Sequence, residues 1–359
     1  MKFFKTIDIY IIKKFLGTFV YAIALIISIV VVFDLAENLD EFLSKNIPVK
    51  AIIFDHYFNF IPYFANLFSG LFTFIAVIYF TSKMAYNTEI IAILSSGVSF
   101  RRFLRPYFFS AFVIALFSFI LGNYIIPPGN KKRIDFRLNY IDNNTVRSER
   151  IIHRQIEPGV YIYMQSFSSN NVGYEFTLEK FEDKQLVEKL SARNIRWDKE
   201  TGKWVLNQYW KRSYRDGEEV IVKGYRMDTT LNMRPEEYRK IKHETETMTT
   251  PEIKKEIKSM KMRGVNAVEY VIEKHKRLSG PFSTFILTLI GAGLASRKVK
   301  GGLGLHLGLG LLFSFSYILF AQISTVFAIS GNTPPLIAVW LPNLVYGAIA
   351  FFVYRWAAR

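Results

Sequence analysis

Hydrophobic positions in this chain of 359 residues are concentrated in long runs rather than scattered among polar ones. Six segments of at least 19 residues contain no Asp, Glu, Lys or Arg. With a rise of ~1.5 Å per residue, a helix of that length spans the ~30 Å hydrocarbon core of a bilayer. The pattern therefore predicts six membrane-spanning helices, over Phe15–Phe33, Phe58–Phe80, Tyr107–Ile126, Leu278–Ser296, Leu303–Ile329 and Leu336–Tyr354.

The pattern changes between the third and fourth of these runs. Short segments rich in β-branched and aromatic residues alternate with turn signals such as Glu157-Pro158-Gly159 and Thr201-Gly202. This arrangement is typical of antiparallel strands in a sandwich or jelly roll. We expect strands over Val160–Phe167, Tyr174–Phe181, Leu190–Trp197, Trp204–Tyr214 and Val220–Thr229.

A helical pattern follows the strands and leads to the fourth run. Thr250 is expected to cap this helix, with Pro251 in its first position and Gly264 at its end. The chain thus predicts an α-helical membrane protein with six transmembrane helices and a jelly-roll-like β domain inserted between the third and fourth. Its expected parts are residues 1–126 (three spans), 127–248 (β domain), 249–277 (helical connector) and 278–359 (three spans).

The distribution of charge sets the expected orientation. The formal net charge is +16, and with the N-terminus inside, the short cytoplasmic segments hold 13 basic residues while the outer ones hold only Lys45 and Lys50. Because Lys and Arg are retained on the cytoplasmic side, both termini are expected there and the β domain on the other side. This bias, together with an excess of basic residues in the large outer domain, accounts for the net charge without nucleic-acid binding.

The sequence lacks the common motifs of catalysis. It contains no cysteine, no Walker A motif, no H-E-x-x-H and no G-x-S-x-G, and its five histidines are scattered. We therefore expect no bound cofactor or metal, no enzymatic activity and no ATP hydrolysis by this chain. Asp34 and Glu37, one helical turn apart, are either an acid/base pair or carboxylates solvated at the interface.

The segment between the second and third runs predicts a short helix near residues 87–97. Asn87 is expected to cap it, Glu89 lies in its first turn, and Gly97 ends it. Ile90, Ile93 and Leu94 form an apolar stripe at helical spacing. Such a helix either transmits force to a soluble partner or rests on the lipid surface.

The fifth run contains an ionisable residue and several glycines. His306 is either a proton relay or a residue that snorkels or forms an interhelical hydrogen bond. Gly304 and Gly308 form a small-xxx-small pair that permits close helix packing, within the chain or against a partner.

Several segments, in this order, resemble the lipopolysaccharide export permeases LptF and LptG over nearly the whole chain. They are Ile7-Asp8-Ile9-Tyr10-Ile11, Glu89-Ile-Ile-Ala92 through Ser95-Ser96-Gly97-Val98-Ser99, Arg277-Leu-Ser-Gly-Pro281-Phe, and Pro335 through Asn343-Leu. The first segment and Ala321-Gln322-Ile323 favour LptG.

The resemblance implies a set of partners. Two permeases, paralogous or identical, pair in the bacterial inner membrane on two copies of a cytosolic LptB-like ATPase, which uses ATP and Mg. The short helix near residues 87–97 is then a coupling helix, which docks in a groove of that ATPase. Its site residues are Glu89, Ile90, Ala92, Ile93, Leu94 and Gly97. The β domain passes the acyl chains of lipopolysaccharide to a periplasmic LptC/LptA-like bridge. Spans one and five form lateral gates, for which Gly304 and Gly308 supply close packing.

The chain departs from the family at the outer end of span one, where Asp34 replaces a basic residue. As a substitute for binding the lipid phosphates we consider the basic residues that flank spans three and four. They are Lys131, Lys132, Arg133, Lys274, Lys276 and Arg277. The alternative is that they only anchor the helices at the interface.

The sequence therefore favours a permease subunit of an ATP-driven extractor of lipopolysaccharide. One alternative is a mechanotransmitting membrane protein that signals to periplasmic partners without moving lipid. That class usually has four spans with the outer domain after the first, unlike the order predicted here. A membrane enzyme acting on lipid-linked sugars is disfavoured because no convincing catalytic pair is found.

Overall fold

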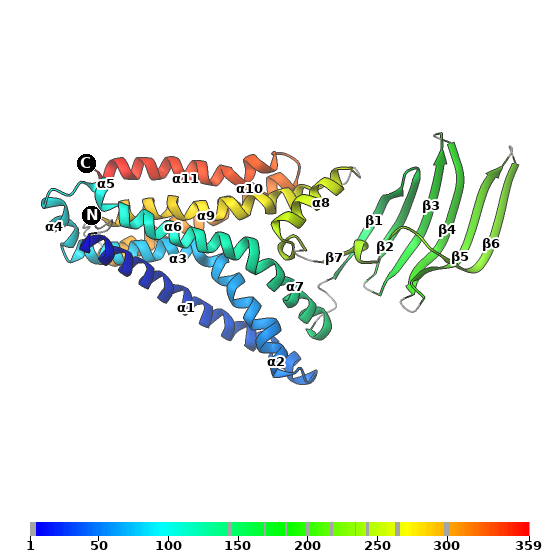
Figure 1. Ribbon diagram of the computed structural model, residues 1–359, viewed down its shortest axis with the longest axis horizontal. Helices are drawn as coiled ribbons and strands as arrows, with labels where there is room; N and C mark the ends of the chain where they lie inside the picture. The colour runs from blue at the N-terminus through cyan, green and yellow to red at the C-terminus, as the bar shows by residue number, and fades with distance from the viewer. Residues whose placement is uncertain are drawn as a thin grey trace. The chain divides into compact units, whose positions relative to one another are not determined.

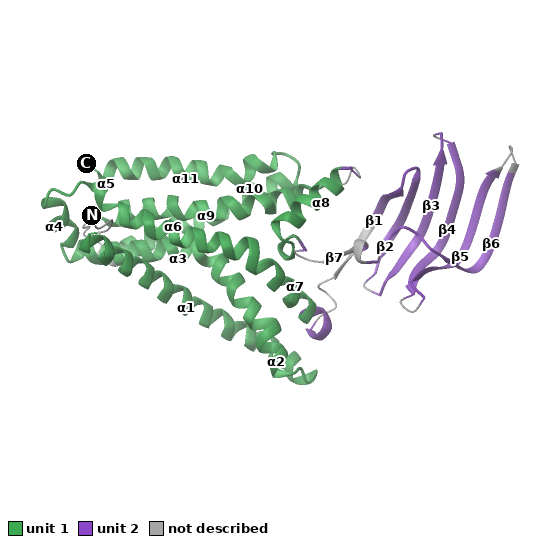
Figure 2. Ribbon diagram, in the orientation of Figure 1, with its two compact units in different colours: residues 1–136, 245–261, 266–359 green, residues 137–244, 262–265 purple. Residues whose placement is uncertain are grey.

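The computed structural model describes residues 5–141, 146–168, 170–183, 185–198, 201–215, 218–233, 235–241, 244–262, 266–297 and 302–358. Its residues form two compact units (Figure 2). The first is helical and comprises residues 1–136, 245–261 and 266–359. The second is built around a β-sheet and comprises residues 137–244 and 262–265. The β unit is therefore inserted into the helical unit, to which the chain belongs again over residues 245–261 and from residue 266 onward.

The described part of the helical unit contains six helices that are long and apolar enough to cross a membrane, which confirms the six predicted spans (Figure 1). They cover Thr6–Ser44, Val49–Tyr86, Phe100–Ile141, Val268–Ala295, Gly304–Ile329 and Pro335–Ala357. Their component helices are α1 (Thr6–Ser44), α2 (Val49–Ala51), α3 (Phe58–Tyr86), α5 (Phe100–Phe103), α6 (Arg105–Ile120), α7 (Ile126–Phe136), α9 (Val268–Ala295), α10 (Gly302–Ile329) and α11 (Pro335–Ala357). Two further helices, α4 (Glu89–Ser95) and α8 (Thr250–Met262), do not span.

Short π-helical segments interrupt two of the spans. Residues Ile52–Tyr57 join α2 to α3, and Leu121–Ile125 join α6 to α7. A π-helical turn leaves the regular i to i−4 hydrogen-bond ladder and is found most often where a helix has a functional constraint. Here Asn123, in the second segment, carries a side-chain contact to the connector helix α8 that is described below.

Helix α9 is the centre of the bundle and contacts α3, α6, α10 and α11. Small residues allow this close packing: a Cβ on Gly291 would lie 3.0 Å from the Phe74 ring, and one on Gly293 would lie 2.6 Å from Val353 Cγ1. Helix α1 differs, because none of its residues between Phe15 and Asn38 is fully buried. The first span is therefore held near its two ends and packed loosely between them.

The described residues of the β unit form one antiparallel sheet with the strand order β6-β5-β4-β3-β2-β1-β7. The strands are β1 (Val146–Glu157), β2 (Val160–Phe167), β3 (Val172–Glu182), β4 (Gln185–Asp198), β5 (Lys203–Arg215), β6 (Glu218–Thr229) and β7 (Arg239–Ile241). All five predicted strands are present, which confirms an inserted β domain. From β1 to β6, neighbours in the sheet are neighbours in the chain, so the connectivity is a meander, without the crossovers of a jelly roll among the described strands.

One face of the sheet carries the core of the β unit. Its fully buried side chains include Trp204, Phe167 and Tyr238, which pack ring against ring. Trp204 Nε1 also donates a hydrogen bond to the Met233 carbonyl, at 3.1 Å. This bond fastens the chain that follows β6 across the apolar face, so Trp204 contributes both buried area and a satisfied polar group.

Replacing Trp204 with alanine is expected to lower the free energy of unfolding of the β unit by ~3–5 kcal/mol, because it leaves a large cavity and removes the donor to Met233. Hydrogen exchange of the β-strand amides in the full chain measures this change. Trp210, half-buried on the same strand, is the matched control, and its alanine variant should lose less than half as much protection. Equal losses in the two variants would contradict this account of the core.

Candidate functional site

The predicted short helix is present as α4, and its ends are set by two residues with positive φ. Thr88 precedes the helix at φ +62°, and Gly97 follows it at φ +85°. A glycine adopts this left-handed conformation without steric cost, so Gly97 ends the helix as predicted. The prediction that Asn87 caps it is wrong by one residue, because Thr88 is the N-cap and Asn87 ends the preceding helix α3.

The apolar stripe of α4 faces the helical bundle. Ile90 is buried, and Ile93 and Leu94 are half-buried against the core that surrounds Phe80, Met84 and Phe103. The opposite face exposes Ile91, at 55%, and Ala92. The helix is therefore attached to the bundle by one side and presents a small apolar surface on the other.

The carboxylate of Glu89 contacts the first helix. Tyr10 Oη donates to Glu89 Oε2 at 2.7 Å, and Lys14 Nζ lies 3.8 Å from Oε1. Asn87 Nδ2 also donates to Oε1, at 3.3 Å. Lys14 in turn lies over the Tyr10 ring, 4.5 Å from its centroid. The residue predicted to reach a partner is thus also bonded within the chain.

A second contact between α1 and the same region was missed by the sequence analysis. Arg102 Nη1 and Nη2 donate to Asp8 Oδ1 and Oδ2 at 2.7 and 2.6 Å, which makes a bidentate ion pair. Asp8 is buried and also accepts the backbone N–H of Lys5 at the start of α1. Its position in an apolar segment, Ile7 to Ile11, was the available signal: a buried carboxylate requires a partner.

The six basic residues proposed for lipid phosphates are not equivalent. Arg277 is buried and donates to Glu273 Oε1 at 2.9 Å, Thr250 Oγ1 at 3.2 Å and the Thr245 carbonyl at 3.1 Å. Arg133 lies over the Tyr63 ring, 4.5 Å from its centroid. These two arginines therefore support the fold. Lys131, Lys132 and Lys276 are exposed, and Lys274 is half-buried.

Helix α8 is attached to the bundle through Thr250. Its Oγ1 donates to Asn123 Oδ1 at 2.6 Å and accepts from Arg277. The residue before it, Thr249, donates through its backbone N–H and its hydroxyl to Glu252 Oε2, at 2.7 and 2.8 Å. These bonds hold the pKa of Glu252 below its ordinary value. The capping pair is Thr249 and Glu252, one residue earlier than the predicted cap at Thr250; the predicted end of this helix, Gly264, lies outside the described residues.

Helix α10 carries the two glycines proposed for close packing. A Cβ on Gly304 or Gly308 would meet nothing within 4 Å, whereas one on Gly310 would lie 2.6 Å from Ile78 Cδ1. Packing within the chain thus occurs at Gly310, and the Gly304 and Gly308 positions face outward. His306 is buried between helices, with Nδ1 2.6 Å from Ser82 Oγ. Of the alternatives for His306, the structure shows the interhelical hydrogen bond.

Asp34 does not pair with Glu37. Its Oδ2 lies 2.8 Å from Nε2 of His56, which is buried among the rings of Phe42, Tyr57 and Phe136. Solvation, the second alternative for these two carboxylates, therefore holds for Glu37, which is exposed, but not for Asp34, which contacts a buried histidine. The contact joins the first and second spans in the C-terminal half of α1.

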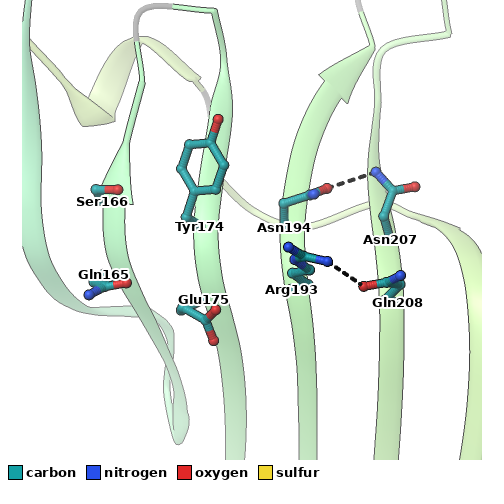
Figure 3. A pocket seen from close by; sticks show the side chains of 8 residues that line it. All are labelled: Gln165, Ser166, Tyr174, Glu175, Arg193, Asn194, Asn207 and Gln208. Atoms are coloured by element: carbon teal, nitrogen blue, oxygen red, sulfur yellow. Dashed lines mark hydrogen bonds between the residues drawn. The ribbon is translucent and has the colours of Figure 1, made fainter.

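A shallow polar depression of about 730 Å³ crosses four strands of the sheet (Figure 3). Two consecutive residues from each strand line it, although alternate residues of a strand normally point to opposite faces. Asn207 Nδ2 donates to Asn194 Oδ1 at 2.7 Å, and Arg193 Nη1 lies 3.4 Å from Gln208 Oε1. The lining residues are Gln165, Ser166, Tyr174, Glu175, Arg193, Asn194, Asn207 and Gln208. In each of the four strands, the alternation of side chains between the two faces of the sheet is therefore interrupted at the depression.

Nothing in the described part of the chain resembles a metal centre, since no group of three His, Asp or Glu side chains lies close enough to hold an ion. The features brought together are instead a helix with one free apolar face, outward glycines on a span, and an all-β insertion. These define a polytopic membrane protein with an inserted β domain.

The comparison with known families agrees with this class. Residues 9–356 match the family described as lipopolysaccharide export system permease LptF/LptG, and the chain belongs to that family. No curated protein matches this chain. Family and fold together make it a multi-pass inner-membrane component of the lipopolysaccharide transporter. The matched family comprises LptF and LptG together, so the lean towards LptG stays a prediction.

Proposed function

We propose that this chain is a transmembrane subunit of an ATP-driven extractor that moves lipopolysaccharide out of the inner membrane. In this proposal two permeases, identical or paralogous, pair and stand on two copies of a separate LptB-like ATPase. The observation that carries it is the form of α4: one face is fixed in the bundle core and the other exposes Ile91 and Ala92. A helix anchored in this way passes displacement by a partner to the spans.

The orientation follows from the charge count. The connections at the α4 end of the bundle hold most of the 13 basic residues assigned to the cytoplasm, and the opposite connection holds Lys45 and Lys50. The α4 face is then available to a cytosolic ATPase, and the β unit stands in the periplasm. ATP and Mg are used by that partner, because this chain has no phosphate-binding loop of the Walker type.

Lipid is proposed to enter beside α1 and α10. The outward face at Gly304 and Gly308 permits close approach of a helix from the paired permease, and the loosely packed middle of α1 lets that helix move aside. The gate is therefore a contact between α10 of one permease and a helix of the other. Because few side chains interlock there, little free energy is needed to separate the two helices.

The lysines among the six basic residues are proposed to bind the lipid phosphates. Arg133 and Arg277 are not included in this role. The Arg133 side chain packs over the Tyr63 ring, and the Arg277 side chain donates to Thr250 at the start of α8. Lys131, Lys132, Lys274 and Lys276 lie on α7 and the first turns of α9, at the end of the bundle from which α8 leaves. Ammonium groups at headgroup depth attract phosphate, and anchoring at the interface is the competing role.

The free edge of the sheet is proposed to extend into the periplasmic bridge. Strand β6 is the last in the sheet order, and it exposes Val220, Ile221 and Val222 at 47 to 49% and Tyr225 at 87%. An apolar edge strand offers unpaired backbone groups to a strand of another protein. A bridge protein of similar fold, LptC- or LptA-like, would continue the sheet and receive the acyl chains.

Affinity recovery from membranes tests the coupling assignment. A tagged wild-type chain is expected to recover a P-loop ATPase, and Ile91→Asp is expected to lower that recovery roughly ten-fold, because a charge replaces a buried apolar contact. The matched control is Tyr225→Asp, which places the same charge on an exposed residue of the β unit. Recovery of no ATPase by the wild-type chain, or equal recovery with Ile91→Asp, would contradict the assignment.

A further inference from the structure

We propose that Asp8, Tyr10 and Lys14 of α1, with Arg102 of α5, form a clamp that makes the first span move with the coupling helix. The inference rests on the proposed function and adds to it the route by which motion of α4 reaches α1. Two independent contacts make the clamp, one to Glu89 of α4 and one to Arg102 of α5. A turn separates these two helices in the chain (Figure 1). The four are positioning residues, since they act through Glu89 and the α1 backbone.

The first contact ties α1 directly to the coupling helix. Glu89 is the first residue of α4, and its carboxylate is held by Tyr10 Oη at 2.7 Å and approached by Lys14 Nζ at 3.8 Å. Tyr10 and Lys14 are one helical turn apart, so both reach the same carboxylate from one face of α1. Hydrogen bonds to a charged group are stronger than neutral ones, which makes this a strong contact between α1 and α4.

The second contact fixes the other end of the connection. Arg102 lies in α5, whose first turn is capped by Ser99, with Arg102 N donating to Ser99 Oγ at 3.3 Å. Its guanidinium donates to the Asp8 carboxylate through Nη1 and Nη2, and Asp8 is only 3% exposed. Because the planar fork allows little rotation about a bidentate pair, α5 and the start of α1 must move together.

Burial on α1 shows that the clamp lies at a natural pivot. Asp8, Ile11 and Phe15 are buried on one face of the helix, against a core that includes Ile90 of α4 and Phe100 and Phe103 of α5. Beyond Phe15, no residue of α1 is fully buried until Asn38. A displacement of α4 and α5 is therefore transferred to α1 at its start and is resisted little along its middle.

The clamp also assigns two roles to Glu89. One carboxylate oxygen accepts from Tyr10 and the other lies near Lys14 and Asn87, while the side chain remains 28% exposed. A basic residue of a docked ATPase can therefore approach the exposed part and compete with Lys14. Tyr10 still holds the other carboxylate oxygen, so α4 stays tied to α1 while the ATPase is docked, and movement of the ATPase reaches the gate helix.

The test is the ratio of lipid exported to ATP hydrolysed by the complex of this chain with its ATPase in proteoliposomes. The double variant Tyr10→Phe with Lys14→Gln keeps the aromatic ring and a polar side chain but removes the Tyr10 hydroxyl and the Lys14 charge, the two groups of α1 that contact Glu89. We expect the ratio to fall roughly ten-fold while ATP hydrolysis stays within about two-fold, as expected for loss of hydrogen bonds to a charged group. The matched control is Tyr21→Phe with Lys13→Gln, at exposed positions of the same helix.

A second variant addresses the other half of the clamp. Arg102→Lys keeps the charge but loses the bidentate geometry, and it should also lower the ratio. An unchanged ratio in both clamp variants, with a coupled wild-type complex, would overturn the clamp and leave the proposed function standing. A wild-type complex that exports no lipid would instead contradict the proposed function itself.

Discussion

Replacing Arg277 with alanine is expected to destabilise the helical unit more than any other single change at the six basic positions. Its side chain is 5% exposed and makes three polar contacts, to Glu273, Thr250 and the Thr245 carbonyl. Breaking a buried ion pair costs ~3–5 kcal/mol. Because the Glu273 side chain remains 21% exposed, we expect a loss of about 2–3 kcal/mol, at or below the lower end of that range.

Unfolding of the full chain in mixed micelles measures this loss, and hydrogen exchange locates it in α8. Lys276→Ala removes an exposed charge one residue away and should change the unfolding free energy by less than ~0.5 kcal/mol. Arg277→Lys should behave almost as Arg277→Ala does, since one ammonium does not reproduce the planar, forked donor set. If the Arg277→Ala protein were as stable as the Lys276→Ala protein, the structural role of Arg277 would be contradicted. Arg277 would then again be a candidate for binding the lipid phosphates.

Substituting leucine for Gly304 or Gly308 is expected to impair lipopolysaccharide export while the protein still folds and inserts. An added Cβ at either position meets nothing within 4 Å of this chain, so the substitution does not disturb the fold. It does fill the outward face on which another helix is proposed to pack. Loss of ~1.4 kcal/mol of that packing weakens the pairing about ten-fold, and export should fall in proportion. The measurement is the rate of export in proteoliposomes at equal protein content.

Two other glycines provide the controls for this experiment. Gly347 on α11 is also open, so Gly347→Leu should leave export unchanged. Gly310→Leu should lower the amount of folded protein, because its Cβ would approach Ile78 Cδ1 to 2.6 Å. Normal export by both Gly304→Leu and Gly308→Leu would remove the close-packing account of the gate.

The elements of the fold were predictable because they depend on local patterns. Charge-free runs located all six spans, although α1 extends from Thr6 to Ser44, well beyond Phe15–Phe33. A charged residue such as Asp8 can lie within a helix when an oppositely charged side chain pairs with it. Counting charges along the sequence does not reveal such a pair. Strand β1 was missed because Val146–Glu157 is rich in Arg and Glu and shows no alternation of apolar and polar positions. The meander order follows from pairing that composition does not encode.

The candidate site was predictable only where the chemistry is local. Glu89, Gly97 and the stripe of α4 follow from spacing within eleven residues. The contacts that decide what these residues do are distant in sequence: Tyr10 and Glu89 are 79 positions apart, and Asp8 and Arg102 are 94 positions apart. Arg277 was assigned to the lipid because Glu273, four residues earlier, was not considered as its partner. A single sequence shows which charged and polar residues are present, but not which of them contact one another.

The central claim is that lipid passes from the membrane bundle into the β unit when the partner hydrolyses ATP. Photoreactive residues at Leu312, exposed on α10, and at Met227, half-buried beside the core of the sheet, test it directly. In proteoliposomes containing the ATPase, we predict a lipopolysaccharide adduct at Leu312 with or without ATP, and an adduct at Met227 only with ATP. An adduct at Leu312 with none at Met227 during ATP hydrolysis would contradict the account.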